Sequence, residues 1–245
     1  MSGTSSDEHY ELLRTVAESD GLDLFATVRV GEHLRNGFHG ALTDISAGLD
    51  SAAVIGIRLS GPVLDTVERA PTWTYYHHYR MVNMALDQAA LRIAGECSRG
   101  GYRAFPVPAS QILDWDRLSA HLSHREVGAL AGLGWRGRNN LLVHPEYGSR
   151  VRYTTVLTEM PLPGAEVMSA SCGSCTACLS VCPVGAIKED PKEFDLDACT
   201  AQLRRFSKKE KLNTLICGLC VRACGGPGFE ERVRGKSIQH DRERK

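Results

Sequence analysis

The sequence predicts an α/β (α+β) domain followed by a smaller domain built around cysteines. Segments with helical and strand-like hydrophobic patterns alternate over roughly the first two thirds of the chain. Eight of the nine cysteines lie in the last third, after a linker marked by Pro161, Pro163 and Gly164. We therefore divide the chain into an N-terminal domain (1–165), a cysteine domain (166–228) and a charged tail (229–245).

The hydrophobic patterns place individual elements in the N-terminal domain. Ser6 or Asp7 is the expected N-cap of the first helix. A capping-box sequence at Ser123 and Glu126 starts a short helix that continues over 127–131. The other expected elements are helices over 7–18 and 75–96 and strands over 22–30, 52–59 and 151–158.

The long helix over 75–96 is expected to bury one stripe of side chains. Val82, Ala85, Ala89 and Ile93 recur at helical spacing. Cys97 lies one turn further along the same stripe. We therefore interpret Cys97 as a packed core thiol rather than as a ninth metal ligand.

Composition excludes several classes of protein. The chain has 245 residues, is 42% hydrophobic and carries a formal net charge of zero, which gives no general attraction to nucleic acid. No apolar run approaches the roughly 18 residues that a membrane helix needs. The polar N-terminus has no secretory signal pattern, so we expect a reducing, cytoplasmic location and no membrane partner.

The cysteine spacing predicts two [4Fe–4S] clusters. The run from 172 to 183 reads CGSCTACLSVCP, which has the spacing of bacterial ferredoxins. In that pattern the fourth cysteine binds a different cluster from the first three. We assign a first set to one cluster, Cys172, Cys175, Cys178 and Cys224, and a second set to the other, Cys182, Cys199, Cys217 and Cys220.

Two other uses of these cysteines compete with the cluster prediction. Pairs of the form CxxC also hold structural zinc, although an evenly repeated triple that ends in Cys-Pro is unusual for zinc. A disulfide framework would require an oxidising compartment. The sequence favours iron–sulfur clusters over both alternatives.

A glycine-rich segment in front of the linker matches a nucleotide-binding pattern only superficially. Residues 132–137 read GLGWRG, which fits GxGxxG. That fingerprint needs a strand before it and a helix after it, so that the helix N-terminus meets the pyrophosphate. Here a capped helix precedes the glycines, and we do not expect a Rossmann site.

The same segment closely resembles the epoxyqueuosine reductase family. Residues 131–142 read AGLGWRGRNNLL, and PEYGS follows at 145–149. A second motif of that family, TEMPL at 158–162, leads into the cysteine run. The resemblance spans roughly residues 75–225 and combines both motifs in the expected order.

This resemblance implies a fold and a set of cofactors. Members of the family, and the related reductive dehalogenases, carry a cobalamin beside two [4Fe–4S] clusters that feed electrons to the cobalt. It implies a nitroreductase-like N-terminal domain and a ferredoxin-like double-cluster domain. Glycines let backbone approach a flat ring, and polar side chains can bond to its amide fringe. By resemblance, the corrin contacts fall on Gly134, Trp135, Gly137, Arg138, Asn139 and Gly148.

An alternative is that these residues only form a tight turn and pack the two domains together.

The chain also departs from the family at the proton donor, which the family places on an aspartate ahead of the glycine motif. Ungapped counting puts Leu118 at that position, and leucine cannot donate a proton. Asp116 is the candidate donor if the loop is shifted. Asp114, His121 and His124 are alternatives, although residues of these types in such positions are more often surface or capping residues.

Two functions are consistent with these motifs. The first is an enzyme, a cobalamin-dependent iron–sulfur reductase acting on a small-molecule or unknown substrate. The alternative is a non-catalytic electron carrier or corrinoid-protein activator. Either would need a redox donor protein of the ferredoxin or flavodoxin type. The chain ends soon after Cys224 without the helical-repeat extension of many family members, and with zero net charge tRNA is a doubtful substrate.

Overall fold

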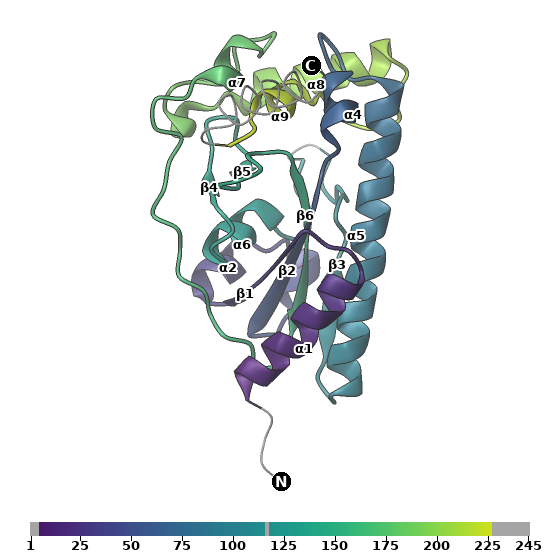
Figure 1. Ribbon diagram of the computed structural model, residues 1–245, viewed down its shortest axis with the longest axis vertical. Coiled ribbons are helices and arrows are strands. Elements are labelled where there is room, and N and C mark those ends of the chain that lie inside the picture. The colour runs from purple at the N-terminus through teal and green to yellow at the C-terminus, as the bar shows by residue number, and fades with distance from the viewer. Residues whose placement is uncertain (1–4, 116–117, 227–245) are drawn as a thin grey trace, which may run out of the picture. The chain divides into compact units, whose positions relative to one another are not determined.

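The computed structural model describes residues 5–115 and 118–226 (Figure 1). The chain forms two compact units, each assembled from three segments. The first unit comprises 1–59, 78–134 and 151–169, and the second comprises 60–77, 135–150 and 170–245, within the described residues. The division into domains at residues 165 and 228 stays a prediction, and the charged tail lies outside the described residues.

The first unit contains a four-stranded antiparallel sheet with the order β1-β2-β6-β3. Its strands are β1 (Leu24–Arg29), β2 (Ser51–Arg58), β3 (Ala104–Val107) and β6 (Val151–Thr158). In the central pair, Val54 lies opposite Thr155. The first six residues of β2 are all buried, which explains their unbroken run of small and apolar side chains. The predicted mixed α+β class is confirmed, and β3 is a strand that the sequence patterns missed.

Helices cover this sheet (Figure 1). They are α1 (Ser6–Ser19), α2 (Glu32–Asn36), α3 (Gly40–Thr43), α5 (Trp73–Arg99) and α6 (His124–Leu130). Helix α6 packs against β1, β2 and β6, and α1 packs against β1. The expected helices over 7–18, 75–96 and 127–131 are therefore present, with bounds shifted by one to three residues.

The buried stripe of α5 differs from the predicted one at one position. Val82, Ala89 and Ile93 are buried as expected, but Ala85 is exposed and Leu86 is fully buried in its place. With 3.6 residues per turn, spacings of four, three and four residues keep one face toward the core. Cys97 continues this face and is fully buried, which confirms its interpretation as a core thiol.

Capping residues fix where the helices begin. The cap of α1 is Ser5 rather than Ser6 or Asp7, because Glu8 completes a reciprocal capping box with Ser5. In α6 the predicted cap is confirmed, since the Ser123 hydroxyl accepts a hydrogen bond from the backbone N–H of Glu126 at 3.3 Å.

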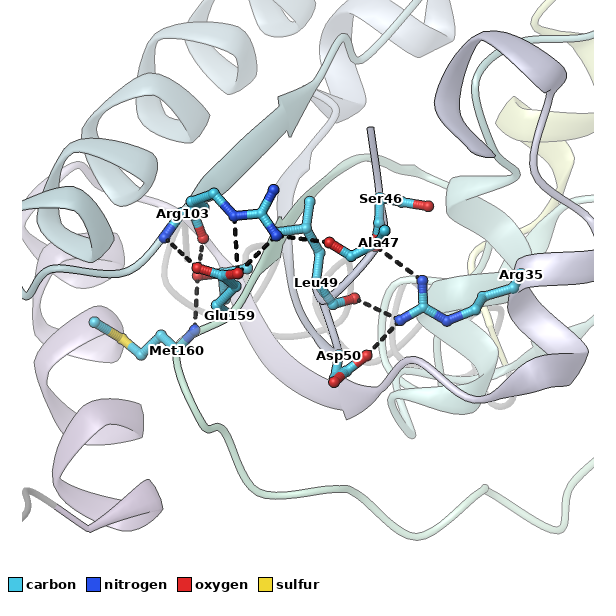
Figure 2. Close-up of polar contacts among 9 residues, drawn as sticks. Arg35, Ser46, Ala47, Leu49, Asp50, Arg103, Glu159 and Met160 are labelled. Atoms are coloured by element: carbon cyan, nitrogen blue, oxygen red, sulfur yellow. Dashed lines mark hydrogen bonds and ion pairs between the residues drawn. The ribbon is translucent and has the colours of Figure 1, made fainter. Parts of the chain in front are cut away.

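Two arginines brace the loop that leads into β2 (Figure 2). Arg35 donates to the carbonyl oxygen of Ser46 at 2.9 Å, and Arg103 donates to that of Ala47 at 2.7 Å. Arg103 also pairs with Glu159, which follows β6. The guanidinium groups thereby bond to backbone carbonyls of the loop that lies between α3 and β2.

The second unit consists of short elements around the cysteines. A two-stranded hairpin joins β4 (Trp135–Arg136) to β5 (Leu142–Val143). Helix α7 packs against α9, and α9 against α4. The helices of this unit are α4 (Gly61–Asp65), α7 (Ala177–Ser180), α8 (Leu196–Lys209) and α9 (Leu219–Ala223), with a 3₁₀ turn at Pro191–Glu193. Within the described part of the chain, no helix has the length and apolar character needed to cross a membrane.

Candidate iron–sulfur site

A cavity of about 680 Å³ in the second unit is bordered by all four cysteines of the first set. Cys172 and Cys175 come from the loop before α7, Cys178 lies within α7, and Cys224 comes from the end of α9. The hairpin contributes Trp135, Arg138, Asn139 and Val143 to the wall. Cysteines that are up to 52 positions apart in the sequence therefore face one space, as the crossed ligand pattern requires.

Electrostatic neighbours identify the same set. Burial raises the pKa of the Cys178 thiol to about 11, and the nearby thiols of Cys224, Cys172 and Cys175 also raise this pKa. These are the three partners that the spacing predicted for Cys178. Within the described residues, no three His, Cys, Asp or Glu side chains converge on a position for a single metal ion.

The second set forms its own neighbourhood. Burial raises the pKa of the Cys217 thiol to about 11, and the nearby thiols of Cys199 and Cys182 also raise this pKa. Burial also raises the pKa of Cys220 well above its usual value, and the nearby thiols of Cys217, Cys199, Cys178 and Cys182 add to it. Since these thiols hold their protons at neutral pH, binding of metal must displace protons from them.

Backbone contacts hold Cys224 beside the hairpin. The N–H of Ser149 donates to the carbonyl oxygen of Cys224 at 3.1 Å. Gly148, with a φ of +61°, and Gly226, with a φ of +82°, allow the two backbones to meet closely. The segment PEYGS thus positions a cysteine that lies about 75 residues later in the chain.

The predicted corrin residues mostly make contacts within the chain. Asn139 is 4% exposed and donates to the hydroxyl of Ser149 at 2.8 Å. A Cβ atom on Gly137 would lie 2.4 Å from Val143, so this glycine is needed for the hairpin itself. Gly134 has a φ of +154°, just before β4. The role of these residues in binding a corrin stays a prediction.

Trp135 has a buried polar atom. Its side chain lines the cavity, and the indole Nε1 is shielded from solvent and has no hydrogen-bond partner among the described residues. A buried donor without a partner is uncommon. Neither the glycine motif nor the composition around it could have revealed this.

The candidate proton donor cannot be placed. Asp116 lies outside the described residues, as does Arg117. Nearby, Asp114 and Ser119 exchange backbone hydrogen bonds at 3.1 and 3.2 Å, and Leu118 has a φ of +50°. The catalytic role of Asp116 stays a prediction.

Both ring nitrogens of His124 have hydrogen-bond partners in the first unit. Its two ring nitrogens contact the carbonyl oxygen of Pro108 and the hydroxyl of Thr155, each at 2.9 Å. Burial lowers its pKa to about 4. With both nitrogens bonded and the ring neutral at physiological pH, His124 fits a packing role better than that of a proton donor.

Sequence reasoning missed a polar cluster in the first unit. The guanidinium carbon of Arg152 lies 4.7 Å from the centre of the Tyr79 ring, and Arg152 also donates to Asn83. Tyr79 shares a 2.8 Å hydrogen bond with Ser110. An arginine at the second position of an otherwise buried strand was the available signal.

Comparisons with known proteins support the cysteine assignment. Residues 171–227, which contain all eight cysteines of the two sets, match the family described as 4Fe-4S double cluster binding domain. The described second unit therefore carries a double-cluster domain, and the ferredoxin-like expectation for this region is confirmed.

Curated relatives carry the name epoxyqueuosine reductase. The protein from Salmonella typhimurium is 30% identical over 155 residues, which cover 63% of this chain and 37% of the relative. The protein from Pseudomonas aeruginosa is 29% identical over 206 residues, which cover 72% of this chain and 54% of the relative. The predicted resemblance is confirmed. The matched region spans about half or less of each of these relatives.

Solved structures share the fold. A catabolic reductive dehalogenase in complex with 3-bromo-4-hydroxybenzoic acid matches with a TM-score of 0.71 at 18% identity, covering 90% of this chain and 32% of that chain. Epoxyqueuosine reductase from Streptococcus thermophilus matches with a TM-score of 0.61 at 15% identity, covering 87% of this chain and 65% of that chain. At these identities the likeness concerns the fold alone.

Proposed function

We propose that the chain is an iron–sulfur oxidoreductase related to the epoxyqueuosine reductases. The cavity bordered by Cys172, Cys175, Cys178 and Cys224 carries this proposal, because it gathers the predicted first ligand set. Cys182, Cys199, Cys217 and Cys220 would hold the second cluster. When bound, the two clusters would supply transfer of single electrons, and a cobalamin would supply reduction of the substrate.

The residues present fit the clusters well. Eight thiols fall into two neighbouring groups of four, and Cys178 of the first group acts electrostatically on Cys220 of the second. Close spacing of the groups suits electron transfer between them. Small residues next to the cysteines, such as Gly173 and Ala177, leave room for backbone to approach the sulfur atoms.

The support for cobalamin is of a different kind. It comes from the resemblance, and from the structural likeness to a reductive dehalogenase that carries out B12-dependent dehalogenation. Within the chain, Arg138 and Asn139 direct their polar atoms to other residues of the protein. Among the described residues, the indole N–H of Trp135 has no hydrogen-bond partner. We therefore derive no step of the reaction through the corrin ring.

The substrate is open. One solved relative, an epoxyqueuosine reductase, is described in complex with an epoxyqueuosine-modified tRNA stem loop. Leu118 occupies the position where the family carries its aspartate, and this favours the second candidate, an electron carrier or corrinoid-protein activator without its own substrate. A donor of the ferredoxin or flavodoxin type would serve either function.

Anaerobic purification with iron, sulfide and cobalamin supplied tests the proposal. We expect about eight iron atoms per chain, four for each cluster. The reduced protein should give EPR signals from two interacting clusters, and cobalamin should co-purify. Iron without cobalamin would support the carrier instead, and a colourless protein with stoichiometric zinc would refute both.

A further inference from the structure

Arg138 contacts the cysteine loop directly. Its Nε donates to the carbonyl oxygen of Glu189 at 2.7 Å. One terminal nitrogen donates to Cys175 at 2.8 Å and the other to Gly173 at 2.9 Å, again at the carbonyl oxygens. The planar guanidinium thereby joins two points of the loop to a third segment further along the chain.

This loop has little else to hold it. Residues 173–176 are exposed, and Gly173 adopts a φ of +52°. Burial of apolar side chains therefore contributes little to the position of Cys175. Because hydrogen bonds from a charged donor are stronger than neutral ones, the three bonds from Arg138 are well suited to fix the loop.

Charge is distributed unequally around the two cysteine sets. Arg138 lines the cavity of the first set, and Arg150 interacts electrostatically with Cys224, although Asp65 interacts with Arg150 more strongly. The second set has a carboxylate nearby, because Asp195 acts electrostatically on Cys199. A positive charge near a cluster stabilises its reduced, more negative state, and a negative charge destabilises that state.

Solvent exposure also favours a higher reduction potential at the first set, while two backbone N–H groups favour a higher potential at the second. Cys175 is exposed to solvent, whereas Cys220 is only partly exposed, and solvent stabilises added charge. On the second set, the N–H groups of Ala186 and Leu219 point to the sulfur atoms of Cys182 and Cys217. These are dipoles, and the full charge of the Arg138 guanidinium beside the first set outweighs them.

We propose that Arg138 is a positioning residue for the cluster held by Cys172, Cys175, Cys178 and Cys224, and that its charge gives this cluster the higher reduction potential of the two. Electrons that enter at the second cluster would then pass to the first in the favourable direction. The inference rests on the ligand sets of the proposed function. It assigns Arg138 to the cluster loop and not to the corrin ring.

Anaerobic redox titration followed by EPR tests this in the full-length holoprotein. Arg138→Gln removes the charge, Arg138→Lys keeps the charge but cannot bond to three carbonyls at once, and Arg136→Gln is the matched control. Arg136 is exposed, and its side chain donates a hydrogen bond to Asn140 within the hairpin. The wild-type clusters are identified by Cys175→Ala and Cys199→Ala, each of which should abolish one signal.

We expect Arg138→Gln to lower the potential of the cluster that Cys175→Ala removes, and to speed its loss of iron to a chelator several-fold. Arg138→Lys should restore most of the potential while iron loss stays fast, and Arg136→Gln should match the wild type. Wild-type potentials and iron retention in Arg138→Gln, or a shift confined to the other cluster, would overturn this inference alone. A wild-type protein without clusters would overturn the proposed function as well.

Discussion

Gly148 lies against Cys224 so closely that a Cβ atom added to the glycine would be 2.2 Å from the carbonyl oxygen of the cysteine. No real pair of such atoms approaches this distance. The glycine also has a φ of +61°, which L side chains rarely adopt. A turn in the middle of the chain thus fixes the position of the last cysteine of the first set.

Gly148→Ala should therefore remove the cluster of the first set. The substitution forces Cys224 away from its three partners and adds the cost of a left-handed conformation, about 1–2 kcal/mol. Iron analysis should show roughly half the wild-type content, with one EPR signal lost. Gly185→Ala is the control, because Gly185 has a φ of +60° and open space around its Cα. If both variants lose the same amount of iron, backbone strain and not the contact with Cys224 is responsible.

Cys182→Ala and Cys97→Ala should behave oppositely. Cys182 acts electrostatically on Cys199, Cys217 and Cys220, so its removal should abolish the second cluster and disturb the first, which shares its loop. Cys97→Ala should leave the iron content unchanged and cost about 1–2 kcal/mol of stability from lost packing. Iron content, EPR and urea unfolding measure these effects. Two unchanged EPR signals in Cys182→Ala would contradict the crossed ligand assignment.

His124 should make the protein less stable as the pH falls. Its pKa is lowered to about 4 in the folded protein by burial, against 6.5 for an ordinary histidine. Between these values the unfolded chain binds a proton that the folded chain does not. The free energy of unfolding should therefore fall by about 1.4 kcal/mol for each pH unit between pH 6.5 and about pH 4. Above pH 6.5 the histidine is neutral in both states and causes no loss of stability.

Urea unfolding under anaerobic conditions at pH 7.5, 6.5 and 5.5 measures this slope. His124→Gln, which can still bond to Pro108 and Thr155, should show a shallower decline than the wild type. Equal slopes for the two proteins would mean that other groups cause the pH dependence.

Arg152 should control the ionisation of Tyr79. Burial alone would raise the pKa of this tyrosine, but the charge of Arg152 and hydrogen bonds from Ser110 and Asn83 outweigh burial and lower it. Arg152→Met should raise the pKa of Tyr79 and cost about 0.5–2 kcal/mol of stability through the lost cation–π contact. Ultraviolet titration of the tyrosines measures the shift, and Tyr79→Phe identifies the signal. Arg152→Lys should preserve part of the effect, and an unshifted titration in Arg152→Met would refute the coupling.

Several elements were predictable because their signals are local. The strand Val151–Thr158 was predicted with its observed bounds, since β-branched residues dominate it. The N-cap at Ser123 was predictable because a capping box needs only four consecutive residues. The short strand β3 was missed because Pro106 lies within it, and proline is tolerated there since β3 is an edge strand of the sheet.

The spacing of the cysteines predicts two sets of four, because the ferredoxin pattern restricts which thiols can reach a common cluster. What surrounds those sets depends on the fold. The contacts of Arg138 with Gly173 and Cys175, and of Gly148 with Cys224, join segments 35 to 76 positions apart, and no local pattern encodes such pairs. Spacing is read along the chain, whereas charge and close approach depend on where folding places each group.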